Sequence, residues 1–359
     1  MSAKNRTMSV SIKDIAKVAG VSHSTVSRAL SDSPLVSAET KARIQSLARE
    51  MGYSPDAQAR SLVMGRTYTI GVVVTTITDP FIAEVVQGIE STAYDHGYTV
   101  ILASSNSEPE REIAAVEMLQ SKRVDGVIVA SSRVGALYRE HLDRLAVPIV
   151  LVNSHSEQSG PYTFSINVDN RHGAYLATDH LIRLGHRCIA YVAGPADHSD
   201  DLERLAGYRQ ALIQAHIAFD QVLVVSGTGR ANGGERALSQ LMALDEPPTA
   251  VFCYNDMTAI GLLHAARQVG LLVPEELAVV GFDDIPFAAY FRPPLTTIAQ
   301  PKPQMGRQAM EMVLALMADG ALGSGAVSNV VVQGQLIVRE SSGRLFRPLK
   351  RLFQRNHLT

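Results

Sequence analysis

From Tyr68 onward the sequence alternates short apolar runs with longer amphipathic segments, and this alternation limits the folds open to the chain. Short runs that are apolar throughout are typical of parallel strands buried on both faces. The first such runs are TIGVVV, YTVILAS, VDGVIVAS and VPIVLVN, separated by helical patterns near 81 to 96, 110 to 122 and 136 to 146. This order predicts a doubly wound parallel sheet with helices on both faces.

After FSINVD the same alternation starts again. The strand runs RCIAYVAG, QVLVVSG, AVFCYND and AVVGFDD alternate with helical patterns at 171 to 184, 202 to 216, 232 to 243 and 257 to 269. A second doubly wound unit is therefore expected. Such sheets bind ligands beyond the carboxyl ends of their strands, so two facing units predict a cleft that closes by a hinge motion.

Residues 11 to 31, SIKDIAKVAGVSHSTVSRALS, predict two short helices joined at Gly20. Ile12, Ile15, Ala16 and Ala19 recur at helical spacing and share one face. Gly20 suits a left-handed C-cap, and Ser22 suits the N-cap of a second helix from about His23 to Leu30. A turn this short makes the helices cross steeply, as in a DNA-reading helix-turn-helix.

The outer face of the second helix is short, polar and basic. Val26, Ala29 and Leu30 are expected to pack inward, which leaves hydroxyl groups and Arg28 facing outward. A major groove admits one helix, and these side chains suit base edges and phosphates. The structural alternative is an amphipathic pair of surface helices with no ligand.

A third helix is predicted from about Ala38 to Met51, capped by Ser37 and with Ala38, Ile44, Leu47, Ala48 and Met51 turned inward; this completes a three-helix head. Gly52 to Pro55 breaks the pattern. The segment from Asp56 to Met64 is helical in composition but too short to be a stable helix alone, so we expect it to fold only when docked on DNA.

The net charge of −2 conceals a strong segregation of charge along the chain. Residues 1 to 66 carry 10 lysines and arginines against 5 acidic residues, and 344 to 359 carry 5 against none. The part between them carries 18 against 30. A basic head on an acidic body favours a polyanion bound by the head alone. For the basic tail, contact with nucleic acid, contact with the acidic body and a solvated terminus remain open.

Several protein classes do not fit this sequence. No apolar run is long enough to span a bilayer and no secretory signal is present, so a soluble, cytoplasmic protein is expected. Cys188 and Cys253 lie in apolar strand-like runs and are expected to be buried thiols. The hydrolase elbow, the P-loop lysine and zinc-ligand spacings are missing from the sequence, so we expect neither an enzyme nor a metal or cofactor site.

Eight segments, in order, resemble the lac repressor / galactose repressor family of bacterial transcription regulators. They are VAGVSHSTVSRAL, GYSPDAQARSL, TDPFIAEVVQGIE, LIRLGHRCIAYVAGP, RLAGYRQAL, NDMTAIGLL, VPEELAVVGFDDIP and PPLTTIAQP. The match runs from about Ile12 to Gly343. The resemblance implies a homodimer that reads a pseudo-palindromic operator in double-stranded DNA, associated with the nucleoid, and a small effector bound between two periplasmic-binding-protein-like subdomains.

The resemblance also implies three crossings between the subdomains. The helix from about Lys302 to Ala318 then belongs with the first sheet, and the strand near 330 to 338 with the second. The expected divisions are a helix-turn-helix head (1–54), a hinge helix and linker (55–66), an N-terminal effector subdomain (67–166 with about 298–328), a C-terminal effector subdomain (167–297 with about 329–343) and a basic tail (344–359).

Family positions transfer to named residues of this chain. His23, Ser24 and Arg28 match base-contacting positions, and Leu62 matches a leucine that wedges into the minor groove and bends the DNA. The full set expected to bind DNA is Ser22, His23, Ser24, Thr25, Ser27, Arg28, Arg60 and Leu62.

The effector-binding residues implied by the resemblance are Asp79, Phe81, Asp169, Arg204, Asn255 and Asp283. Carboxylates accept hydrogen bonds from hydroxyl groups, the planar guanidinium group of arginine donates several hydrogen bonds, and phenylalanine supplies an apolar face. Structural alternatives exist for most of them. Asn255 and Asp283 could cap helices, Arg204 could pair with Asp200 or Asp201, and Phe81 could be core.

The loop SGTGRANGG places Gly229 near the point where several family members carry an aromatic side chain that stacks on the ligand. A sugar or sugar derivative is therefore favoured as the effector, with a purine or nucleoside as the alternative. Two rival functions, a sugar-modifying enzyme and an exported solute-binding protein, would leave the basic head unexplained.

Overall fold

The computed structural model describes residues 10–53, 65–131, 147–154, 163–196, 198–318 and 329–343. The chain divides into two compact units, Met1–Thr67 and Tyr68–Thr359. The predicted helix at 136 to 146, the segment 56 to 64 and the tail from 344 lie outside the described residues. Within the described part, no helix has both the length and the apolar composition needed to cross a bilayer.

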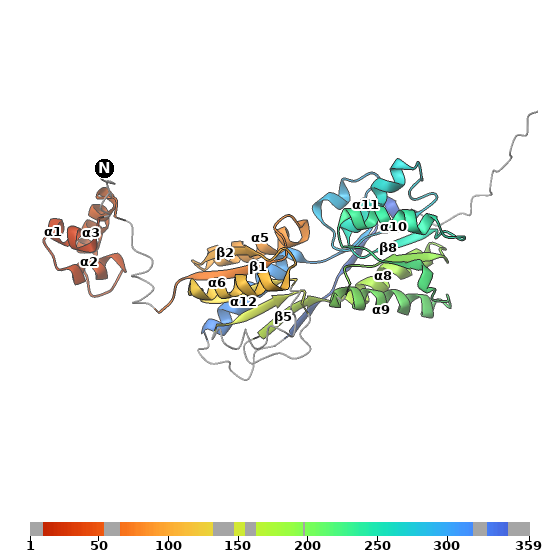
Figure 1. Ribbon diagram of the computed structural model, residues 1–359. Coiled ribbons are helices and arrows are strands. Elements are labelled where there is room, and N and C mark those ends of the chain that lie inside the picture. The colour runs from red at the N-terminus through yellow and green to blue at the C-terminus, as the bar shows by residue number, and fades with distance from the viewer. Residues whose placement is uncertain are drawn as a thin grey trace, which may run out of the picture. The chain divides into compact units, whose positions relative to one another are not determined.

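The first unit contains three helices around a small core (Figure 1): α1 (Ile12–Ala19), α2 (His23–Leu30) and α3 (Ala38–Glu50). Ile15, Val26 and Ile44, one from each helix, have no exposed surface. Since each helix buries one stripe against the other two, the three are held together by apolar packing. Ala38, expected to face inward, is exposed in the first turn of α3.

Local sequence fixes where these helices begin and end. Ser11 and Asp14 form a reciprocal capping box at the start of α1, and Gly20 ends that helix with a φ of 67°. Ser22 and Ser37 cap α2 and α3, each accepting a hydrogen bond from a backbone N–H three residues later. The predicted caps are therefore confirmed.

The second unit contains two α/β lobes. The first lobe consists of a six-stranded sheet and the helices α5 (Pro80–Asp95), α6 (Pro109–Ser121) and α12 (Lys302–Ala318). Its strand order is β11-β5-β4-β3-β1-β2, and every pairing is parallel. The strands are β1 (Thr69–Val74), β2 (Thr99–Ser104), β3 (Gly126–Ala130), β4 (Ile149–Val152), β5 (Thr163–Val168) and β11 (Asn329–Val332).

Alternate residues of β1 face opposite layers of the first lobe. Ile70, Val72 and Val74 join the core beside α5 and α12, whereas Val73 packs with Leu119 of α6. Helices therefore cover both faces of this sheet, as the alternating sequence predicted.

The second lobe consists of a four-stranded sheet and the helices α8 (Asn170–Arg183), α9 (Ser199–Gln214), α10 (Ala231–Met242) and α11 (Asp256–Gln268). Its parallel strands lie in the order β7-β6-β8-β9. They are β6 (Ile189–Val192), β7 (Val224–Val225), β8 (Ala250–Cys253) and β9 (Ala278–Val280). Helices α8 and α9 pack on one face and α10 and α11 on the other (Figure 1).

Two strand predictions need correction. The strand expected near 330 to 338 is two strands: β11 pairs with β5 in the first sheet, and β12 (Gln335–Ile337) pairs antiparallel with β10 (Thr297–Ala299). The family-based assignment to the second sheet is therefore wrong for β11, whereas β12 lies in neither large sheet and packs through Leu336 with the core around α8. The run QVLVVSG forms a 3₁₀ turn, Gln221–Leu223, followed by a strand of only two residues.

Both cysteines are free thiols. Cys253 lies on β8 with no exposed surface, as expected. Cys188 precedes β6 and is only half-buried, because the chain reaches the buried part of the strand one residue later.

Candidate functional site

In the head, α2 presents the polar face predicted to read DNA. His23, Ser24, Ser27 and Arg28 are exposed, and Thr25 is half-buried. The opposite face is anchored, since Val26 and Ala29 have no exposed surface. A fixed backbone with outward hydroxyl, imidazole and guanidinium groups is what base and phosphate contacts require.

Ser22 is committed to the cap of α2. Its Oγ accepts a hydrogen bond from the Thr25 backbone N–H at 3.1 Å and lies 2.8 Å from the hydroxyls of both Ser24 and Thr25. The exposed N–H groups of this helix start also favour a phosphate. Arg60 and Leu62, the other residues expected to contact DNA, lie outside the described residues.

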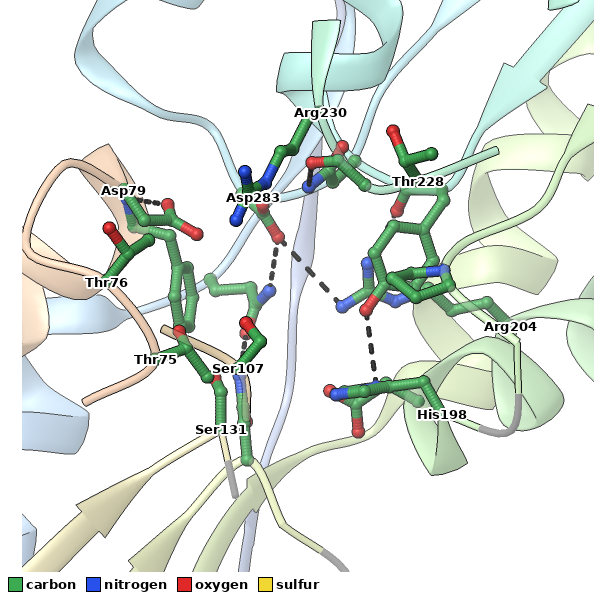
Figure 2. A pocket seen from close by; sticks show the side chains of 18 residues that line it. Thr75, Thr76, Asp79, Ser107, Ser131, His198, Arg204, Thr228, Arg230 and Asp283 are labelled. Carbon is green, nitrogen blue, oxygen red and sulfur yellow. Dashed lines mark hydrogen bonds and ion pairs between the residues drawn. The ribbon is translucent and has the colours of Figure 1, made fainter. Parts of the chain in front are cut away.

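A cavity lies beyond the carboxyl ends of the strands in both lobes, with a void of about 690 Å³ that is partly open to solvent (Figure 2). Most of the lining side chains carry hydroxyl, amide, carboxylate or cationic groups. The lining residues are Thr75, Thr76, Asp79, Phe81, Ser107, Ser131, Asn153, Pro195, His198, Asp200, Arg204, Thr228, Gly229, Arg230, Tyr254, Asn255, Asp283 and Gln300.

Arg204 is almost fully buried in the wall of the cavity, with 2% of its surface exposed. Its Nε donates to Asn170 Oδ1 at 2.8 Å, and Nη1 donates to the Tyr254 carbonyl at 2.5 Å. Nη2 lies 4.0 Å from Asp283 Oδ1, at the limit of an ion pair. The alternative that Arg204 pairs with Asp200 or Asp201 has no support in these hydrogen bonds.

Asp283 follows β9 and turns its carboxylate toward the cavity (Figure 2). Its φ of 119° lies in a region that side-chain-bearing residues rarely adopt. Gln300 Nε2 donates to Oδ1 at 2.7 Å. Burial raises the pKa of the Asp283 carboxyl to about 7, against the opposing effect of the Arg204 and Lys302 cations. The group can therefore change its charge near neutral pH.

Asp79 and Phe81 reach the cavity from the start of α5. Asp79 caps the helix by accepting from the Phe81 backbone N–H at 2.9 Å, and burial raises the pKa of its carboxyl. Phe81 is 6% exposed and belongs to the core of the first lobe while also lining the cavity. It therefore serves both as core and as an apolar wall.

Asn255 and Asp169 are both helix caps, but only Asn255 lines the cavity. Asn255 accepts from the Thr258 N–H at 2.9 Å and donates to the Gly229 carbonyl at 3.0 Å. Asp169 accepts from the His172 N–H at 2.8 Å and from Gln333 Nε2 at 3.2 Å. Five of the six expected effector residues are thus brought together, and Asp169 is not.

Several lining residues were not predicted from the sequence, among them His198, Tyr254 and Gln300. Tyr254 directly follows β8, and its hydroxyl lies 3.4 Å from His198 Nδ1. Gln300 follows β10 and connects Asp283 to Asn153, whose Nδ2 donates to Gln300 Oε1 at 3.2 Å. The position of Tyr254 and Gln300 directly after strands was a signal that could have found them, whereas His198, at the start of α9, carried no such signal.

Two family models match the chain. The model of bacterial regulatory proteins, lacI family, matches residues 11–56, and the periplasmic binding protein-like domain matches residues 178–342. HTH-type transcriptional repressor PurR of Vibrio atlanticus (strain LGP32) is 39% identical over 309 residues, 86% of this chain and 92% of PurR. HTH-type transcriptional repressor CytR of Escherichia coli (strain K12) is 36% identical over 345 residues, 96% of this chain and all of CytR.

Solved structures agree with these matches. A lac repressor dimer bound to operator and the anti-inducer ONPF has a TM-score of 0.84 at 28% identity, over 93% of this chain and 99% of that one. A complex of the transcriptional regulator CelR with cellobiose has a TM-score of 0.70 at 31% identity, over 92% and 99%. The chain belongs to the lacI family of bacterial regulatory proteins and is a DNA-binding transcriptional repressor controlled by a small molecule, not an enzyme.

Proposed function

We propose that the effector of this repressor is a sugar or sugar derivative bound in the cavity of the second unit. The observation that carries the proposal is the polar lining of that cavity. The carboxylates of Asp79 and Asp283 can accept hydrogen bonds from hydroxyl groups of a ligand there. Arg204 and Asn255 add further polar groups, and Phe81 supplies one apolar wall. This mixture suits a ring that has several hydroxyl groups around its edge and an apolar face.

The comparison with CelR supports the same class of ligand, because that regulator is similar over most of its length and holds cellobiose. The position of Gly229 in the lining adds to this support. A glycine has no ring with which to stack a planar base, so the contacts at this point of the cavity are small and polar.

A nucleoside is the second candidate, and the observation in its favour is a pair of aromatic side chains. Phe81 and Tyr254 both line the cavity and come from different lobes. Aromatic faces can pack against a base, while the carboxylates bind the hydroxyls of its sugar. Both candidates would therefore use Asp283.

The proposal for the DNA side is a homodimer on a pseudo-palindromic operator, acting at the nucleoid. In each copy α2 enters the major groove with His23, Ser24 and Arg28 toward the bases, and the segment carrying Arg60 and Leu62 contacts the minor groove. Exposure of the α2 face and its capping by Ser22 support this arrangement.

Fluorescence anisotropy with DNA from upstream of the protein's own operon tests the DNA side. Salt-dependent, sequence-selective binding is expected, together with a loss of at least tenfold in Arg28→Ala. Arg49→Ala is the matched control, since Arg49 is an exposed arginine on α3 of the same head. Equal affinity for operator and random DNA would overturn the proposal.

Isothermal titration with cellobiose, common monosaccharides, nucleosides and purine bases tests the effector. A sugar is expected to bind and to change the affinity of the protein for its operator. The operator must then change the affinity for the sugar by the same factor. Binding of nucleosides but not of sugars would replace the first candidate by the second. Binding of none of them would sink both.

A further inference from the structure

Lys302, the first residue of α12, is a lysine with only 3% of its surface exposed. Its ammonium group donates hydrogen bonds to the backbone carbonyls of Asp283 and Asp284, both at 2.6 Å. It also forms an ion pair with Glu84 Oε2 at 3.0 Å. A buried cation is costly unless its charge and its donors are satisfied, and here three oxygens satisfy them.

The two carbonyls that Lys302 binds belong to a strained turn. Asp283 has a φ of 119° and Asp284 a φ of 51°, both in the region that residues with a Cβ rarely adopt. Such conformations persist only where neighbours hold them in place. The side chain of Asp283 is held separately by Gln300, so the turn is secured through both its backbone and its carboxylate.

Lys302 also connects the two lobes. It begins α12, and Glu84 lies on α5, and both helices pack on the sheet of the first lobe. Asp283 and Asp284 follow β9 of the second lobe. Glu84 lies three residues after Phe81 and five after Asp79, within about one and a half helical turns of these two cavity-lining residues.

We propose that Lys302 is a positioning residue for the effector site: its ammonium group fixes the strained turn that presents Asp283 to the cavity and ties that turn to α5 through Glu84. The inference rests on the proposed function, because it assumes that Asp283 contacts the effector. Closure of the lobes on a ligand would then be coupled to the position of α5 through the buried ammonium group of Lys302.

Charge is the property that separates positioning by Lys302 from simple packing. The charged groups facing Asp283 are Arg204 from α9, Asp79 from the start of α5, Asp256 from α11, Asp284 from its own turn, and Lys302 from α12. Burial raises the pKa of Asp283, and Arg204 and Lys302 lower it. Removing the Lys302 charge must therefore raise that pKa further, and removing its partner Glu84 must lower it.

The deciding experiment is a carboxyl ¹³C NMR titration of the full-length, ligand-free protein labelled at aspartate, with Asp283→Asn identifying the resonance. Lys302→Met is expected to raise the pKa of Asp283 by about one unit, Lys302→Arg to leave it within a few tenths, and Glu84→Gln to lower it. Arg339→Met is the matched control, because Arg339 pairs with Asp284 at 2.7 Å and not with Asp283. It is expected to cause less than half the shift of Lys302→Met.

The proposal is overturned if Lys302→Met and Glu84→Gln leave the Asp283 titration unchanged or move it in the same direction. Should Lys302→Met fail to fold by circular dichroism, Glu84→Gln decides: it must lower the pKa of Asp283, and by more than the control Arg339→Met changes it. A separate calorimetric titration with cellobiose and common monosaccharides at pH 8 addresses the function itself. Absence of sugar binding by the wild-type protein contradicts the proposed effector, while the ligand-free titration still decides the role of Lys302.

Discussion

The guanidinium carbon of Arg204 lies 3.8 Å from the centroid of the Phe282 ring and 4.6 Å from that of Tyr254. The planar cation is therefore in contact with two aromatic rings, while its edge donates to Asn170 and to the Tyr254 carbonyl. Unlike lysine, arginine offers a flat, delocalised cation with donors along its edge. Arg204 also lines the cavity together with Asp283, so its contacts with the two rings hold a charged part of the cavity wall in place.

Arg204→Lys is expected to weaken effector binding at least tenfold although the charge is retained, because a lysine ammonium can neither stack on both rings nor donate as a fork. Isothermal titration with the tightest-binding member of the sugar and nucleoside panel measures the loss. Arg209→Lys is the matched control: Arg209 lies on the same helix, 4.3 Å from the Phe219 ring, and does not line the cavity. Equal effects of the two substitutions would remove Arg204 from the site.

Asp283 should make the stability of the second unit depend on pH. Burial raises the pKa of its carboxyl from an ordinary 3.8 to about 7, so the folded state holds its proton more tightly than the unfolded state does. The contribution of this group is then fully present below pH 3.8 and is lost as the pH rises toward 7, at about 1.4 kcal/mol for each unit of raised pKa.

Urea denaturation between pH 4 and 8 measures this contribution as the difference between wild type and Asp283→Asn. Taking that difference cancels the opposite trend expected from His180 and His186, whose burial lowers their pKa values. The stability of wild type relative to the variant should fall between pH 4 and 7 and then level off. A flat difference across this range would mean that Asp283 has an ordinary pKa in the folded protein.

Sequence patterns predicted local structure well, because periodicity and caps are local properties. The run TIGVVV forms β1 over its full length, and Ser22 caps α2 as predicted. The pairing of β11 was beyond such reasoning. Its residues NVVV are apolar enough for either sheet, and only the long-range hydrogen bonds to β5 decide which edge they join.

The same limit applies to the site. Asp79 and Asp169 both follow a strand and cap a helix, yet only Asp79 lines the cavity, whereas Asp169 accepts a hydrogen bond from Gln333, a residue far away in the sequence. Gln300 lies in the segment PPLTTIAQP and Lys302 at the start of a predicted helix, but neither pattern indicates a contact with Asp283. Their contacts with Asp283 span nearly twenty residues and depend on the crossing of the chain between lobes.

Close packing of α5 against α12 depends on two glycines. A Cβ added to Gly88 would lie 2.2 Å from the Pro303 carbonyl oxygen, and one added to Gly306 would lie 2.1 Å from the Val85 carbonyl oxygen. Backbone cannot move as a flexible side chain can, so the helices would have to separate. Gly88→Ala and Gly306→Ala should each destabilise the second unit by about 1–3 kcal/mol despite the better helix propensity of alanine.

Chemical denaturation with circular dichroism detection checks these two substitutions. Ser91→Ala, at an exposed position of α5, is the control and should change the stability of the unit by less than about 0.5 kcal/mol. Wild-type stability in both glycine variants would show that α5 and α12 tolerate a wider separation.

Leu62 provides the sharpest test of DNA recognition. The resemblance to the family makes it a wedge that partly unstacks a base step, and such a wedge adds binding energy only where the DNA bends to accept it. Leu62→Ala should therefore weaken operator binding far more than nonspecific binding, which depends on phosphate contacts. Fluorescence anisotropy at matched salt, with operator and scrambled duplexes, measures both. Leu35→Ala, a change at a 76% exposed leucine of the head, controls for the loss of apolar surface. Equal losses on the two duplexes, or the same loss in Leu35→Ala, would show that Leu62 does not read the operator.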